Sequence, residues 1–303
     1  MRRIRFERVF SLCSGLALAT VSAAGCSGDA GTSPDDGGLI LTVLCQEIQD
    51  EIVSAGPRGG IPALTDPDLV GPDSPLIDFL LPTDRVIGLE INGEYLAIPH
   101  NILWWHEIAN FIDHGLTVTF CPLTGSSMVF QRQGDEGDEF GVSWLLFKNN
   151  LVMYDRPIVE TGSPGEDSVW PQMLAGGFCG PSEGEKLTMV PAIEIEWEDW
   201  LALHPDTRVV GSETGISRDY TLYPYGNYEV ENNYLTLAPV KNLDFRRPPK
   251  ERILGIPFVD GQGGIAFPFG ALRDAAVGDL AVVHTILGDG NEAQGRVDPV
   301  VVF

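Results

Sequence analysis

Short apolar runs separated by Gly, Pro and Asn recur along the chain, and this pattern is typical of strands joined by turns. Asn92-Gly93 and Asn149-Asn150 each stand between two such runs. They predict hairpin turns, because these residue types tolerate positive φ. The runs themselves predict strands at 86–91, 95–98, 116–121, 127–133, 140–147, 151–154 and 208–211. We therefore expect a β-rich α+β fold with mostly antiparallel strands.

A few stretches carry helical spacing instead. Apolar residues predict a short helix over 40–53. Pro99 pre-sets the first turn of a helix expected over 101–111, and Pro205 ends another expected over 197–204. The helices are thus expected to be few and short.

Part of the sequence pattern occurs twice. Residues 252–255, 266–268 and 278–284 resemble 85–88, 97–99 and 115–121, in the same order. We therefore expect one β-rich domain over 57–303 with an internal repeat, 85–132 resembling 252–303, and two pseudo-symmetric halves. Chance matching of apolar strand patterns is the alternative. If the repeat is real, His284 takes the place of Cys121.

Residues 1–26 predict a lipoprotein-type signal peptide. Four arginines precede a run of apolar and small residues that ends at Cys26, which would carry the lipid. Plain secretion without a lipid is the alternative. Residues 27–56 then predict a polar tether and the short helix. We expect the chain in the cell envelope, facing the periplasm or the exterior and anchored to the membrane through Cys26.

The remaining cysteines indicate which disulfide and which free thiol to expect. Three cysteines, Cys45, Cys121 and Cys179, stay in an oxidising compartment once the signal is removed and Cys26 is lipidated. We expect a disulfide between Cys45 and Cys179, both in loop-like surroundings, and a free thiol at Cys121.

The formal net charge of -24 excludes one class of partner. The acidic residues are spread along the chain, so the surface would repel nucleic acid, and we expect no nucleic-acid binding. Solubility accounts for the charge without a special function.

Potentially reactive side chains gather between residues 100 and 125. On a helix, His106 and Asn110 would share one face, one turn apart, while Glu107 points about 100° away. Cys121 ends a predicted strand and precedes a turn of small residues, which would lower the pKa of its thiol. A Cys121–His106 pair suits copper or zinc, with His284 as a further ligand. The alternative is structural: polar groups that satisfy buried backbone, and a cysteine in the core.

Several motifs occur in a fixed order: WHEI with Asn110, CPLTGS from Cys121, LVMYDR ending at Arg156, Trp170 with Gln172, and HPDT from His204. This order resembles the bacterial domain-of-unknown-function family 3179 from about residue 59 onward. The resemblance implies a secreted protein or lipoprotein and no established activity. The motif positions that it implies are His106, Glu107, Asn110, Cys121, Gly125, Asp155, Arg156, Trp170 and Gln172.

Two main hypotheses of function follow. In the first, an extracytoplasmic lipoprotein uses a pocket of Cys121, His106 and Glu107, with Asn110, Asp155, Arg156, Trp170 and Gln172 as binding residues, to hold a soft metal or to act through its thiol. In the alternative, a binding module without catalysis recognises a carbohydrate or a partner protein through Trp104, Trp105, Trp170 and the tyrosines from Tyr220 to Tyr228. A hydrolase with Glu107 and Asp155 as paired carboxylates is a weaker third hypothesis.

Overall fold

The structure is a computed structural model of the 303-residue chain, and it describes residues 51–56, 59–132, 139–156, 167–231, 243, 245–257, 264–275, 281–286 and 297–302. The chain divides into two compact units, 1–36 and 37–303, and all described residues lie in the second. In these ranges no helix is long and apolar enough to cross a bilayer.

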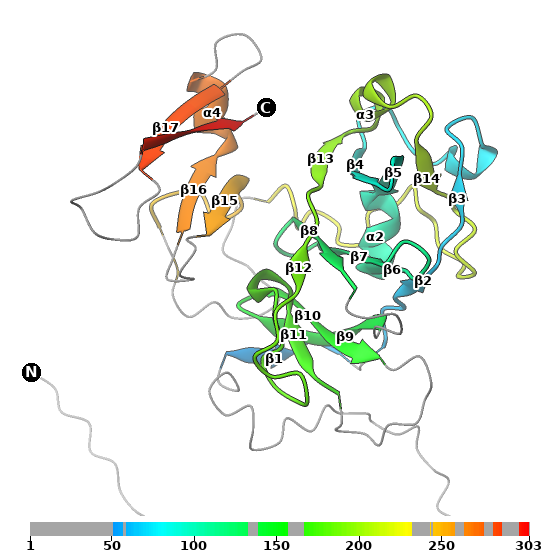
Figure 1. Ribbon diagram of the computed structural model, residues 1–303, viewed down its shortest axis with the longest axis horizontal. Coiled ribbons are helices and arrows are strands. Elements are labelled where there is room, and N and C mark those ends of the chain that lie inside the picture. Colours follow the sequence, from blue (N-terminus) through cyan, green and yellow to red (C-terminus); the bar gives the residue numbers. More distant parts are fainter. Residues whose placement is uncertain are drawn as a thin grey trace, which may run out of the picture. The chain divides into compact units, whose positions relative to one another are not determined.

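Antiparallel strands build most of the described structure (Figure 1). One five-stranded sheet has the order β13 (Ile193–Glu196), β4 (Arg85–Ile91), β5 (Glu94–Pro99), β14 (Arg208–Val210) and β3 (Leu69–Val70). A second has the order β12 (Thr188–Met189), β8 (Ser126–Gln131), β7 (Leu116–Cys121), β6 (Ile108–Phe111) and β2 (Leu64–Thr65). A four-stranded sheet has the order β1 (Ile52–Ser54), β9 (Glu139–Phe147), β10 (Asn150–Arg156) and β11 (Val169–Pro171).

Helices are short. They are α2 (His100–His106), α3 (Trp197–Leu203) and α4 (Phe269–Ala275), with 3-10 turns η2 (Pro75–Ile77) and η3 (Gln172–Leu174). Two further hairpins, β15 (Ile253–Pro257) with β16 (Gly264–Pro268) and β17 (Ala281–Ile286) with β18 (Val297–Val302), complete the described elements. The predicted β-rich α+β class with mostly antiparallel strands is confirmed.

The two hairpin turns form at residues that adopt positive φ angles. Asn92 and Gly93 both have positive φ, 52° and 84°, as the sequence predicts. The second hairpin turns one residue earlier than expected, because Lys148 and Asn149 take the positive φ angles and Asn150 opens β10. This shift places the Asn149 side chain beside the turn that follows Cys121, where its Nδ2 donates to the Leu123 carbonyl at 3.5 Å and to the Tyr228 hydroxyl at 3.0 Å.

Helix α2 lies between the hairpin β4–β5 and strands β6 and β7 (Figure 1). Its buried residues Ile102 and Leu103 join Ile87, Ile98 and Val118 in the largest apolar cluster. Helix α3 covers the other face of the first sheet. There the Trp200 ring lies so close to Gly88 that a Cβ on Gly88 would stand 2.5 Å from it.

Two helix predictions need correction. The helix expected over 101–111 ends at His106, and residues 108–111 form β6, because they pair with β7. The helix expected over 40–53 is wrong at its end, since Ile52–Ser54 pairs with β9 as strand β1. Residues 40–50 lie outside the described residues.

The two segments of the expected repeat show the same local order. In the first, Val86 pairs with Pro99 and Gly88 with Ala97, and α2 starts directly after Pro99. In the second, Ile253 pairs with Pro268 and Gly255 with Ala266, and α4 starts directly after Pro268. Both segments therefore contain a hairpin in equivalent register followed by a seven-residue helix.

Candidate functional site

Glu107 occupies the junction between α2 and β6. Its backbone N–H donates to the Leu103 carbonyl at 2.8 Å, and its carbonyl accepts from the Phe120 N–H at 2.8 Å. Between these bonds Glu107 has φ 57° and ψ -31°. A residue with a Cβ rarely adopts this geometry, which costs on the order of 1–3 kcal/mol. Packing on both sides enforces it, because His106 and Ile108 are both fully buried.

The Glu107 carboxyl is buried without a counter-ion. The residue is 8% exposed, and its Oε1 accepts a hydrogen bond from the Tyr225 hydroxyl at 3.3 Å. Burial raises the pKa of this carboxyl from 4.5 to about 7, although the Tyr225 hydrogen bond acts in the opposite direction. No Lys, Arg or His in the described ranges forms an ion pair with it. The acid therefore changes protonation near neutral pH.

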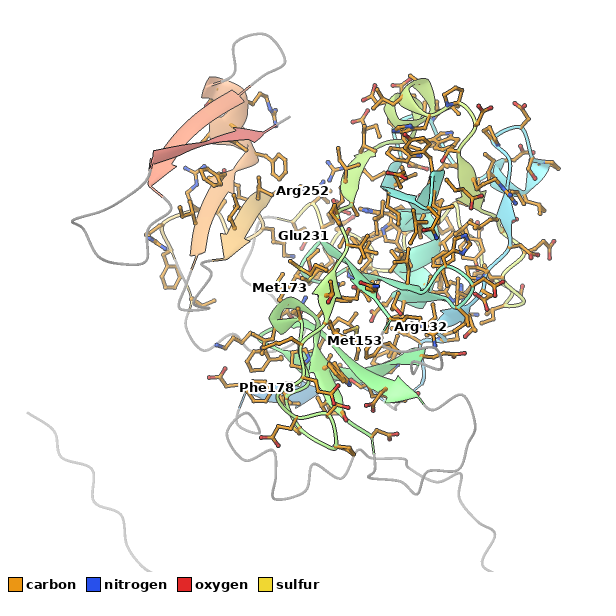
Figure 2. All side chains as sticks on the ribbon, viewed as in Figure 1. Arg132, Met153, Met173, Phe178, Glu231 and Arg252 are labelled. Carbon is orange, nitrogen blue, oxygen red and sulfur yellow. The ribbon has the colours of Figure 1, made fainter. Side chains whose placement is uncertain are left out.

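Residues 221–231, which we call the tyrosine loop, cover this carboxyl. All are exposed except Tyr223, Tyr225 and Tyr228, which are half-buried. The Tyr223 ring meets Trp104 edge to face at 5.0 Å and lies 5.5 Å from the Tyr225 ring. Glu231, labelled in Figure 2, marks the end of the loop. Tyrosine side chains thus attach the loop to the body of the protein.

Tyr228 forms the second polar contact of the loop. Its hydroxyl donates to the Leu123 carbonyl at 3.2 Å and accepts from Asn149 Nδ2 at 3.0 Å. Leu123 lies in the turn directly after Cys121, so the loop spans from the end of α2 to the end of β7.

Cys121 lies beneath this surface and is not accessible. The thiol is free, but the residue is 1% exposed and packs among apolar side chains that include Phe130, Leu151 and Met153. Burial raises its pKa, and the nearby Glu107 carboxyl raises it further. Hydrogen bonds from Thr124 and Leu151 oppose these effects without outweighing them. The prediction of an exposed thiol with a lowered pKa is wrong, because the strand end is covered.

The His106 ring does not contact Cys121; it bonds to Pro62 and Tyr220. Its Nδ1 lies 2.7 Å from the Pro62 carbonyl, which can only accept, so Nδ1 carries the proton. Its Nε2 then accepts from the Tyr220 hydroxyl at 2.8 Å, and burial lowers the pKa of the ring. Both ring nitrogens are therefore engaged away from the Cys121 sulfur, which contacts Leu151 and Asn149.

Two other predicted site residues, Asn110 and Gln172, have structural roles, because all hydrogen-bonding groups of their side chains are used within the protein. Asn110, on β6 and not on a helix with His106, donates to Leu64 and Phe140 carbonyls and accepts from the Phe140 N–H and the Thr117 hydroxyl. Gln172 likewise donates to the Thr119 hydroxyl and the Ser126 carbonyl, and it accepts from Ser126 and Asn150. Neither amide has hydrogen-bonding capacity left for a ligand.

The remaining predicted residues are spread over the structure. Asp155 accepts from the Ser168 N–H, and Trp170 packs edge to face on Phe140 at 5.6 Å in the core. The side chains of Arg156 and His284 are outside the described part, as are Cys26 and Cys45. Lipidation of Cys26 and the disulfide between Cys45 and Cys179 therefore stay predictions. Among the residues described, no three His, Cys, Asp or Glu side chains form a group that could hold a metal.

A family model described as "Protein of unknown function (DUF3179)" matches residues 58–294, most of the chain. The chain belongs to this family. No curated protein and no solved structure matches it. The resemblance drawn from the motifs is thus confirmed, whereas no activity comes with the DUF3179 assignment.

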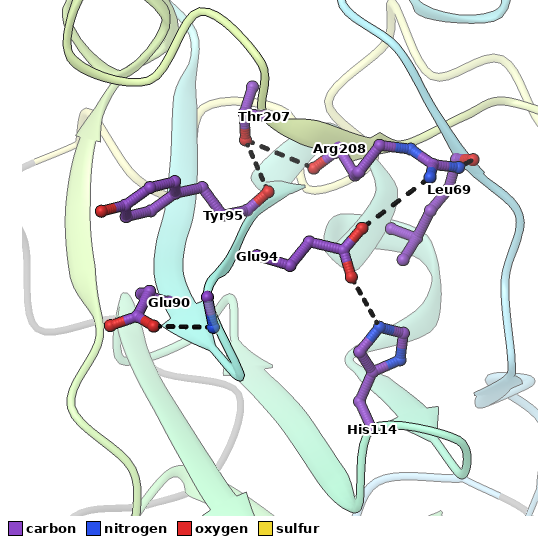
Figure 3. Close-up of polar contacts among 8 residues, drawn as sticks. Leu69, Glu90, Glu94, Tyr95, His114, Thr207 and Arg208 are labelled. Carbon is purple, nitrogen blue, oxygen red and sulfur yellow. Dashed lines mark hydrogen bonds and ion pairs between the residues drawn. The ribbon is translucent and has the colours of Figure 1, made fainter.

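A cavity of about 270 Å³ lies elsewhere in this DUF3179 protein. Asp66, Asp68 and Asp113 line it together with His114 and Arg208. Glu94 contacts two of these residues (Figure 3), and its carboxylate lies 3.4 Å from His114 Nε2 and 3.8 Å from Arg208 Nη1. Glu94 and Arg208 are exposed and His114 is partly exposed, so these ion pairs contribute little. Glu107 is the better candidate.

Sequence reasoning did not connect Tyr225 with Glu107, or Asn149 with Tyr228, in this DUF3179 chain. Tyr225 lies 118 positions from Glu107, and no spacing rule joins residues so far apart. The sequence offered one signal, the tyrosines in the otherwise polar run from Tyr220 to Tyr228. Such tyrosines indicate that the run packs against the rest of the protein, but they do not indicate which residues it contacts.

Proposed function

We propose that this protein binds a small molecule beneath the tyrosine loop and that Glu107 donates or accepts a proton there. The supporting observation is the buried carboxyl, which forms no ion pair among the described residues and is held in a strained backbone geometry next to a tyrosine hydroxyl. Strain and a shifted pKa are both typical of acid–base sites.

The chemistry follows from the carboxyl's surroundings. With a pKa of about 7, Glu107 is present in both protonation states near neutral pH, which suits a general acid or base. Tyr225 fixes the direction of one carboxylate oxygen. Cys121 stays a neutral thiol under these conditions, because burial raises its pKa, and it contributes an apolar wall.

The Cys121–His106 pair expected to hold copper or zinc, or to activate the thiol, is a less supported alternative. Both side chains would have to leave their present partners to meet. A binding module without catalysis is a second candidate, favoured by the half-buried aromatic residues Trp104, Trp105 and Tyr223. A carbohydrate or partner protein bound there would not need the Glu107 proton.

Infrared spectroscopy as a function of pH tests the acid–base proposal. A protonated carboxyl band that disappears near neutral pH in the wild type, and is absent in Glu107→Gln, is the expected result. Tyr225→Phe should shift the midpoint upward, because it removes the hydrogen bond that stabilises the charged form. A carboxyl that is already ionised at pH 5 would refute the proposal.

We also propose that the protein resides in the cell envelope, anchored by lipid at Cys26. The supporting observation is the arginine-rich and apolar segment that ends at this cysteine. Labelled fatty acid should enter the wild type but not Cys26→Ser. Equal labelling of the two would contradict the anchor.

A further inference from the structure

Among the described residues, those around Glu107 bring aromatic rings but no balancing charge. Trp104, Tyr223 and Tyr225 form a connected series of rings, with neighbouring centroids 5.0 Å and 5.5 Å apart. The Tyr225 hydroxyl contacts the carboxyl itself. A carboxylate beside several aromatic rings is the combination that recognises an ammonium group, because ring faces and carboxylate both attract a cation.

Cations of the chain already lie on two further aromatic residues, Tyr228 in the same loop and Trp105 next to Trp104. Lys250 Nζ stands 3.7 Å from the centre of the Tyr228 ring, and the Arg218 guanidinium lies 5.6 Å from the Trp105 ring. Neither of these cations, nor any other Lys, Arg or His in the described residues, forms an ion pair with Glu107. A buried carboxylate without a counter-ion is unfavourable, so a cation brought from outside would stabilise its charged form.

The loop that covers the carboxyl can give access to it. In the described residues, the backbone hydrogen bonds that begin within 221–231 are local turns, such as Tyr228 to Tyr225 and Val230 to Asn227. Attachment to the body comes from tyrosine side chains, from the Trp105 Nε1 bond to the Leu222 carbonyl, and from Lys250 Nζ, which donates to the Tyr228 carbonyl. A segment held by few side-chain contacts opens at low free-energy cost.

We propose that the ligand of this site is a small organic cation, an amine or a quaternary ammonium compound, which binds the Glu107 carboxylate and the faces of Tyr223, Tyr225 and Trp104. This inference rests on the proposed function and names its ligand class. The net charge of -24 supports it, since an acidic surface concentrates cations and repels anions.

Binding should depend on pH through Glu107. The titratable groups that interact with its carboxyl are Tyr225 from the loop and Cys121 from β7, and burial keeps both neutral at neutral pH by raising their pKa values. His106 points to Pro62 and Tyr220. Glu107 alone among these groups therefore ionises between pH 6 and 8, and cation affinity should rise over that range.

Calorimetry with choline and its uncharged isostere 3,3-dimethylbutan-1-ol tests the proposal on the full-length protein. We expect choline to bind at least about tenfold more tightly than the isostere, and Glu107→Gln to remove this preference and the pH dependence. Tyr223→Leu should weaken choline binding, whereas the control Tyr95→Leu, which removes a ring stacked on His204, should not.

Equal affinity for choline and the alcohol, or no choline binding at millimolar concentration, would overturn the inference. Binding of a neutral sugar such as maltose without choline binding would instead favour the carbohydrate alternative. If the Glu107 infrared band titrates near neutral pH and yet no cation binds, only the ligand class fails and the acid–base centre stands. If no protonated Glu107 carboxyl band is seen, both the acid–base proposal and the cation proposal are refuted.

Discussion

Replacement of Glu107 by Gln should change how stability depends on pH. The unfolded chain ionises this carboxyl near pH 4.5, whereas the folded chain holds its proton until pH 7 or so. Below pH 4.5 both states are protonated and the residue has no effect. Between these values the folded state binds more protons than the unfolded state, so the free energy of unfolding falls as pH rises.

The magnitude follows from the two pKa values. A rise from 4.5 to about 7 corresponds to a loss of about 3 kcal/mol that is complete above pH 7. Because unfolding free energies of domains are on the order of 5–15 kcal/mol, this loss is measurable. Glutamine keeps the shape of the side chain and an oxygen that accepts from Tyr225, but it cannot ionise. The variant should therefore lack this part of the decline.

Urea denaturation from pH 4 to pH 8.5 measures the effect. The difference in unfolding free energy between Glu107→Gln and the wild type should increase by about 3 kcal/mol from pH 4 to pH 8 in favour of the variant. Glu213→Gln, at an exposed position, serves as the control. Parallel curves for Glu107→Gln and the wild type would show that the carboxyl is solvated, and the acid–base proposal would lose its basis.

Three further predictions test the packing around the site. Cys121 should react with iodoacetamide only upon unfolding, and mass spectrometry of its peptide that shows rapid labelling of the native protein would contradict the burial described here. Gly88→Ala should lower the free energy of unfolding by about 2 kcal/mol or more because its Cβ meets the Trp200 ring, whereas Gly255→Ala, with open space around it, should be nearly neutral in thermal unfolding. Asn110→Ala should cost about 3 kcal/mol in urea denaturation, since four buried partners lose their bonds, and a cost equal to that of the exposed Asn227→Ala would refute its role as a brace.

The sequence predicts those parts of the fold that depend on local backbone chemistry. Asn92-Gly93 turns as expected because few other pairs accept two positive φ angles, and Pro99 stands directly before a helix. The end of α2 was not predictable in the same way. Residues 101–111 have helical spacing, but pairing of 108–111 with β7 decides their conformation and leaves Glu107 with positive φ. Long-range contacts override local propensity here.

The same distinction applies to the candidate site. The sequence singles out Glu107, Cys121 and His106 because they are close along the chain, but closeness in sequence does not fix which side chains share an environment. Because the helix ends at His106, its ring and the Glu107 carboxyl contact different tyrosines, Tyr220 and Tyr225. The grouping of Glu107 with the tyrosine loop depends on tertiary structure alone.

The structural roles of the motif residues isolate Glu107 further. Asn110 and Gln172 have every polar group bonded within the chain, so their presence is explained by folding. Glu107 is not explained in this way. Glycine would adopt its backbone geometry without strain, and a neutral amide would avoid an unpaired buried acid. A residue that destabilises the fold through both backbone and side chain is the one whose carboxyl is needed for something other than folding.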